Sequence, residues 1–177
     1  MREIISHKER REHLIIMIPY PKYSETVALQ KLRKYCAYQE RCHQEVKTKI
    51  LSWNFPYRVA DQFLVQLIEE GFLNEERFAK AFAGGKFRQK GWGRLKIINA
   101  LKQKGISPYL INSSMKEIRG DDYQVKLEQL LKKKMPTLKA DQQWIMKQKL
   151  ARFAISKGYE SEMVWIAIKE LLDNEAI

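Results

Sequence analysis

Apolar residues recur at intervals of three and four positions through almost the whole chain after residue 24. This spacing places them along one face of a helix, which has about 3.6 residues per turn. No stretch in this region alternates well enough between apolar and polar positions to predict a strand. The pattern therefore predicts an all-α fold. The predicted apolar stripes include Val27, Leu29 and Leu32, then Val125, Leu127 and Leu130, then Trp144, Ile145 and Leu150.

Turn and capping residues divide this pattern into separate helices. Gly71, Gly105 and Gly158 each follow an apolar helical run, where a residue in the left-handed conformation commonly ends a helix. Asn74 is placed to cap a helix whose first turn carries two glutamates. Ser107 is placed to cap a helix that begins with proline. These signals predict short helices joined by tight turns.

The helices form three copies of one three-helix unit. The copies align on Asn54, Gly105 and Gly158, which are 51 and 53 residues apart. A lone unit of this size would bury little surface, but tandem units can share interfaces. The aligned apolar columns are Val46, Ile97 and Leu150; Ile50, Leu101 and Ala154; Phe55, Ile106 and Tyr159; Val59, Leu110 and Met163; Leu64, Met115 and Ile168; and Leu67, Ile118 and Leu171.

We therefore expect three tandem three-helix repeats in an elongated, curved array. The expected segments are a variable N-terminal arm at 1–23, repeat 1 at 24–73, repeat 2 at 74–118 and repeat 3 at 119–177. Their net charges are +2, +1, +7 and +2, so more than half of the overall +12 lies in repeat 2.

The excess charge of repeat 2 lies in one stretch that has no acidic residue. Ten basic residues occur from Arg77 to Lys116. An ordinary exposed helix mixes both signs of charge to gain favourable pairs. The stretch therefore indicates contact with a polyanion such as DNA, or with an acidic protein surface. A face balanced by acids from elsewhere in the fold is the alternative.

The densest basic cluster surrounds a glycine-rich turn. Gly91 and Gly93 permit a positive φ or a close approach of two backbones there. Arg94 and Lys96 fall in the first turn of the next helix, where backbone N–H groups attract anions and cations are unfavourable. A bound phosphate would remove that penalty. Trp92 is either a stacking residue for a base or partner surface, or a core anchor of the turn.

Other functional classes find little support. There is no phosphate-binding GxxxxGK[ST] loop, no GxSxG motif and no metal-ligand spacing, so we expect no enzyme, no metal and no cofactor. Cys36 and Cys42 do not form a CxxC motif and are expected to be buried thiols. The longest apolar run near the N-terminus has five residues, whereas a bilayer span needs about 20. We expect a cytoplasmic monomer that does not bind a membrane.

Three runs of the sequence resemble the RecX family of bacterial recombinase regulators: residues 70–79, 88–93 and 104–106. The resemblance is specific over residues 70–106 and looser over residues 24–173. It implies a tandem array of three-helix units that binds the RecA recombinase filament on DNA and restrains recombination and the SOS response. Such an array would meet the phosphates of single- and double-stranded DNA. The candidate contact residues are Arg77, Lys80, Lys86, Arg88, Lys90, Trp92, Arg94, Lys96, Lys102 and Lys104.

Two other functions remain open from the sequence. One is a sequence-specific DNA-binding regulator with a helix-turn-helix at residues 94–117. The other is a protein-only helical scaffold whose basic face meets an acidic partner. Arg77 also has a second interpretation, as a structural partner of a nearby carboxylate, because it lies three residues after its helix cap.

Overall fold

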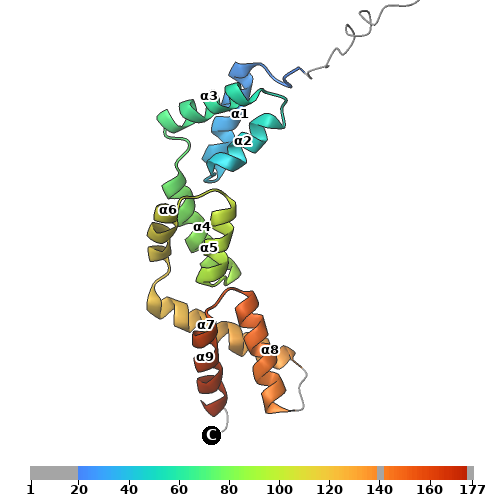
Figure 1. Ribbon diagram of the computed structural model, residues 1–177, viewed down its shortest axis with the longest axis vertical. Coiled ribbons are helices and arrows are strands. Elements are labelled where there is room, and N and C mark those ends of the chain that lie inside the picture. Colours follow the sequence, from blue (N-terminus) through green and yellow to red (C-terminus); the bar gives the residue numbers. More distant parts are fainter. Residues whose placement is uncertain (1–19, 139–141, 175–177) are drawn as a thin grey trace, which may run out of the picture.

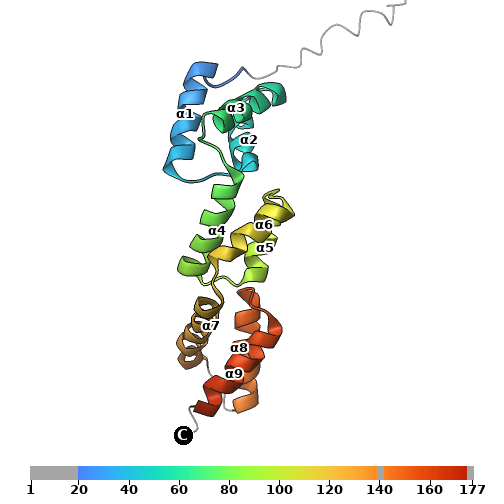
Figure 2. The same ribbon diagram turned by 90° about the vertical axis from the view of Figure 1, so that its left-hand side faces the viewer.

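The computed structural model describes residues 20–138 and 142–174, and their regular structure is entirely helical. The α-helices of these residues form three successive groups of three, and the groups follow one another along the long axis of an elongated molecule (Figures 1 and 2). This arrangement confirms the predicted all-α array of three-helix units. Most of the expected N-terminal arm, residues 1–19, lies outside the described residues. The helices are α1 (Glu25–Tyr38), α2 (His43–Leu51), α3 (Tyr57–Glu69), α4 (Glu75–Lys90), α5 (Arg94–Gln103), α6 (Pro108–Ser114), α7 (Gly120–Lys134), α8 (Gln143–Ser156) and α9 (Ser161–Asn174), with 3₁₀ turns η2 (Met115–Glu117) and η3 (Met135–Thr137).

The predicted caps begin the helices of repeat 2. The side chain of Asn74 accepts a hydrogen bond from the backbone N–H of Arg77 at 2.9 Å and starts α4. Ser107 accepts one from the backbone N–H of Leu110 at 3.4 Å and starts α6. Each contact satisfies a backbone donor that has no partner within the helix.

The repeat alignment is confirmed in the backbone. Asn54, Gly105 and Gly158 follow the second helix of their units with φ values of 64°, 75° and 92°. An asparagine stands in the first copy because, among residues with a side chain, it tolerates this left-handed conformation comparatively well. The equivalent side chains Ile50, Leu101 and Ala154 are all buried, with at most 1% of their surface exposed. Local backbone geometry and core position therefore repeat together.

Two hydrophobic cores run through the array. One core lies within repeat 1 and is built from residues 28–73. The other is continuous through repeats 2 and 3, from Phe78 to Leu172, and includes Cys42 as its member from repeat 1. The first joint of the array thus has little apolar contact, whereas the second joint is part of one core.

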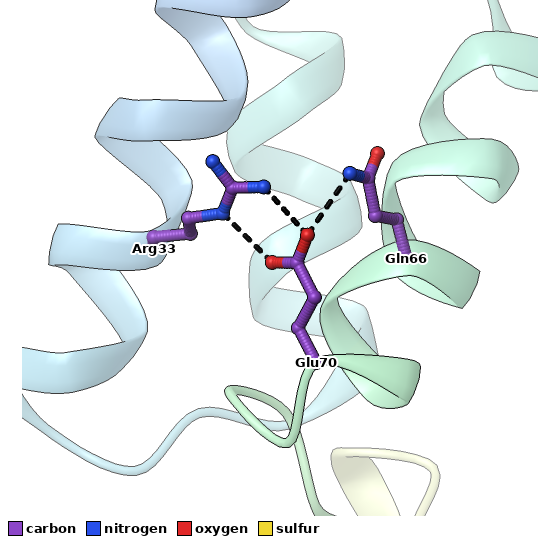
Figure 3. A network of polar contacts seen from close by, with 3 residues as sticks. All are labelled: Arg33, Gln66 and Glu70. Atoms are coloured by element: carbon purple, nitrogen blue, oxygen red, sulfur yellow. Dashed lines mark hydrogen bonds and ion pairs between the residues drawn. The ribbon is translucent and has the colours of Figure 1, made fainter.

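A polar network closes repeat 1. The guanidinium of Arg33 on α1 donates to both carboxylate oxygens of Glu70, at 2.7 and 2.5 Å, just after α3 ends (Figure 3). Gln66 donates to the same carboxylate at 2.9 Å. These hydrogen bonds, chiefly the one from Arg33, lower the pKa of Glu70. The middle of α1 is therefore tied to the end of α3.

Three predicted stripe positions are exposed instead of buried. Val27, Val125 and Trp144 expose 40%, 51% and 63% of their surface. In α7 the buried face is formed by Tyr123, Leu127 and Leu131, which are four residues apart. Val125 lies off this face. In α1 the buried residues are Ala28, Leu29, Leu32 and Cys36, so Val27 lies outside the buried face.

Candidate nucleic-acid and partner interface

The glycine-rich turn between α4 and α5 is the joint between repeats 2 and 3. Gly91 ends α4 with φ +60°, as its predicted conformational freedom allows. Gly93 lies directly against the turn that ends α8, so closely that a Cβ on Gly93 would meet the carbonyl oxygen of Gly158 at 2.2 Å. The N–H of Gly93 donates to the carbonyl of Lys157 at 2.8 Å, and the N–H of Leu95 to that of Gly158 at 3.1 Å. Two turns from different repeats are therefore bonded backbone to backbone.

The start of α5 is further occupied by a buried tyrosine. The hydroxyl of Tyr123 accepts from the backbone N–H of Arg94 at 3.0 Å and donates to the carboxylate of Glu160 at 2.6 Å. The Arg94 guanidinium lies 4.2 Å from the centre of the Tyr123 ring and donates to the carbonyl of Ile118 at 3.2 Å. Burial, followed by the hydrogen bond to Glu160, raises the pKa of Tyr123. This network links α5, α7 and the loop before α9.

The structure does not support the expected phosphate site at the N-terminus of α5, because the backbone N–H groups that would bind it are already hydrogen-bonded. The backbone N–H groups of Gly93, Arg94 and Leu95 already have protein acceptors. The amine of Lys96 donates to the carbonyl of Ser156 at 3.0 Å. Arg94 contacts Tyr123, and Lys96 contacts Ser156, so the protein itself supplies partners in repeat 3 for the groups that the sequence analysis assigned to a phosphate.

Charged pairs form the joint between repeats 1 and 2. Arg77 meets Glu40 at 2.9 Å and also donates to the carbonyl of Gly71 at 3.0 Å. Lys104 meets Glu45 at 2.6 Å. The structural interpretation of Arg77 therefore holds in this structure, and these acids come from repeat 1.

The other candidate cations lie on the surface of repeat 2. Lys80 pairs within its own helix with Glu76 at 2.7 Å. Within the described part of the chain, no ion pair involves Arg88, Lys90 or Lys102, and all three are exposed. The uncompensated part of the predicted basic surface is therefore narrower than the acid-free stretch of sequence.

Trp92 and Lys86 meet at the edge of a groove. Trp92 is half-buried and packs edge to face with Phe82, with ring centres 6.5 Å apart. The amines of Lys86 and Lys96 each lie 5.0 Å from the centre of a Trp92 ring. Trp92 is thus neither a fully buried anchor nor a freely exposed ring.

The groove has a volume of about 1150 Å³ and lies between repeats 1 and 2. Helix α4 forms one wall, where Phe82, Lys86 and Lys90 stand at steps of four. The end of α1 and the outer side of α2 supply Tyr35 and Lys49 on the opposite wall. Sequence reasoning missed the second wall because repeat 1 has a net charge of only +1.

Repeats 2 and 3 both match models of known three-helix domains. The profile of the second three-helix domain of RecX matches residues 74–115, and that of the third matches residues 121–168. The chain belongs to the RecX family. The regulatory protein RecX of Chlorobium phaeobacteroides is 30% identical over 135 residues, which cover 76% of this chain and 84% of the relative. The regulatory protein RecX of Haemophilus influenzae (strain PittGG) is 28% identical over 138 residues, which cover 77% and 90%.

Solved RecX structures share the fold. The crystal structure of RecX from Lactobacillus salivarius superposes with a TM-score of 0.72 at 19% identity, covering 83% of this chain and 96% of that one. A second RecX crystal structure gives 0.73 at 19% identity, covering 82% and 71%. In the described ranges, no helix of this RecX chain is long and apolar enough to cross a bilayer.

Proposed function

We propose that this RecX protein regulates recombination by binding the RecA filament on DNA and inhibiting its ATPase and strand-exchange activities. The family relationship supports a regulatory role, since its relatives are named as regulatory proteins. The observation that carries the proposal is the set of exposed repeat 2 cations without ion pairs in the described structure: Arg88, Lys90 and Lys102. Such cations attract phosphates and acidic side chains and accelerate association with them. An elongated shape allows simultaneous contact with DNA and several recombinase subunits.

Sequence-specific reading by a helix-turn-helix finds less support. Its second helix would be α6, which has seven residues and no basic side chain. Recognition helices commonly read base edges with arginine, lysine, asparagine or glutamine near their N-termini. In α6 the first residues are Pro108 and Tyr109. DNA contact by this protein is therefore proposed to depend on phosphates rather than on one operator sequence.

The test is a matched pair of charge reversals. In the repeat 2 variant, Lys86, Arg88 and Lys90 become glutamate, which changes the net charge from +12 to +6. Lys96 is left unchanged because its amine is bonded to repeat 3. The control variant reverses Lys132, Lys133 and Lys134 of α7 and has the same net charge.

Both variants should fold, because surface substitutions usually change stability by about 0.5 kcal/mol or less each. The repeat 2 variant should lose inhibition of DNA-dependent recombinase ATPase and strand exchange. The control should retain most of it, since Asp121, Asp122 and Glu128 offset the charge of its helix. Circular dichroism checks folding. Equal inhibition by the parent and a folded repeat 2 variant would refute the proposed role of this surface.

A further inference from the structure

The groove between repeats 1 and 2 combines an aromatic lining with an excess of positive charge. Phe78, Phe82 and Trp92 line it from repeat 2, and Tyr35 from repeat 1. Five basic residues and two acidic residues also line it. The acids Glu40 and Glu45 are engaged by Arg77 and Lys104. The basic lining residues are Arg41, Lys49, Lys86, Lys90 and Lys104.

A glycine keeps the α4 wall of this groove open. Gly85 stands in the middle of α4 and lines the groove, and a Cβ added there would meet no atom within 4 Å. A glycine inside a helix usually costs about 0.5–1 kcal/mol of stability relative to alanine. Its neighbour Gly84 differs, because the guanidinium of Arg88 lies over it. Packing within the chain therefore accounts for Gly84 but gives no reason for Gly85, whereas a ligand in the groove gives one.

We propose that this groove binds single-stranded DNA, with an unpaired base stacked against Trp92 and the adjacent phosphates held by Lys49, Lys86 and Lys90. The inference deepens the proposed function and rests on the DNA contact in it. Proteins that hold single strands combine a basic groove with aromatic side chains on which bases stack. In a duplex the faces of the bases are covered by their neighbours, so a paired base has no face to offer Trp92. The groove therefore selects single strands over duplex DNA.

Binding of labelled oligothymidine to the full chain, followed by fluorescence anisotropy, tests this site without the recombinase. Trp92→Leu should weaken binding about 5- to 150-fold, as expected for the loss of one stacked base. Trp92→Phe retains a stacking face and should weaken binding less. Gly85→Leu should also weaken it, because the new side chain enters the groove from a position where its Cβ meets nothing. The control Trp144→Leu alters an exposed tryptophan in repeat 3 and should leave the affinity unchanged.

Gly85→Leu keeps the test valid if Trp92→Leu fails to fold, since leucine is the better helix former. Affinity of folded Gly85→Leu for oligothymidine equal to that of the parent would overturn the groove site and leave the regulatory proposal intact. If Gly85→Leu lost recombinase inhibition but kept the oligothymidine affinity of the parent, the single-strand site would also be overturned, because the groove would then hold a protein segment. Equal weakening on a duplex of the same length would refute the selectivity for single strands. Weakened oligothymidine binding would support the site even if the repeat 2 charge reversal left recombinase inhibition unaffected.

Discussion

Replacement of Gly93 by alanine should separate repeats 2 and 3 at their joint. The added Cβ would lie 2.2 Å from the carbonyl oxygen of Gly158 and 2.4 Å from the backbone nitrogen of Tyr159. Favourable contacts between carbon and other heavy atoms need about 3.5 Å, so the two backbones must move apart by about 1 Å. That movement breaks the hydrogen bonds from Gly93 to Lys157 and from Leu95 to Gly158, now 2.8 and 3.1 Å long.

The cost follows from these two hydrogen bonds. Each N–H donor left without a partner destabilises the fold by about 1–3 kcal/mol, so the two donors alone give an expected loss of about 2–6 kcal/mol. Two other glycines provide internal controls. Gly105→Ala introduces only the strain of a left-handed backbone, about 1–2 kcal/mol, because nothing lies within 4 Å of its Cβ. Gly85→Ala should stabilise the protein by about 0.5–1 kcal/mol.

Urea unfolding followed by circular dichroism gives the three free energies, provided that the slopes with denaturant agree. From most to least stable, the predicted order is Gly85→Ala, the parent, Gly105→Ala and Gly93→Ala. A midpoint for Gly93→Ala equal to or higher than that of Gly105→Ala would show that the backbones at this joint are not in contact, and the reasoning would be wrong.

Further outcomes are expected from the cores, the titrating groups and the salt response. Leu101→Ala and Ile50→Ala, at equivalent buried positions, should each cost about 2–5 kcal/mol in thermal or urea unfolding. Burial raises the pKa of Tyr123, so its contribution to stability is complete below about pH 10 and is lost as the pH rises further; Tyr123→Phe should flatten this alkaline loss in urea unfolding. Burial raises the pKa of Cys36 to about 11, so at pH 8 it should carry about 100-fold less thiolate than an exposed cysteine and react correspondingly slowly with iodoacetamide. Duplex affinity should fall with salt at a log–log slope of about −4 to −5 if about five phosphates are neutralised, and the repeat 2 variant should reduce this slope by about 3; a flat response of the parent would contradict phosphate binding.

The fold was predictable because its signals are local. A cap such as Asn74 and a left-handed turn such as Gly105 act on residues within one helical turn, and both stand where the chain pattern places them. The repeat alignment then identified the buried columns, since equivalent residues such as Ile50 and Leu101 occupy equivalent places in each unit. Val125 was misplaced because several apolar residues in one helix allow more than one choice of inward face.

The candidate site was less predictable because the partners of its charges come from distant repeats. Arg77 pairs with an acid 37 residues earlier, and Lys104 with one 59 residues earlier. Lys96 reaches a carbonyl 60 residues later. A count of charge along the sequence cannot include such pairs, so the acid-free stretch overstated the available positive surface. The groove was missed for the same reason, since its two walls belong to different units.

The contrast between the two joints gives the array unequal stiffness along its length. Repeats 2 and 3 can part only by exposing a shared apolar core and breaking backbone hydrogen bonds. Repeat 1 is attached mainly through ion pairs around a single buried thiol, Cys42, and ion pairs at a surface weaken as salt screens them. When partners bind at both ends of the molecule, bending is therefore expected at the joint between repeats 1 and 2. We therefore expect repeat 1 to move relative to a rigid unit of repeats 2 and 3, and to move more as the ionic strength rises.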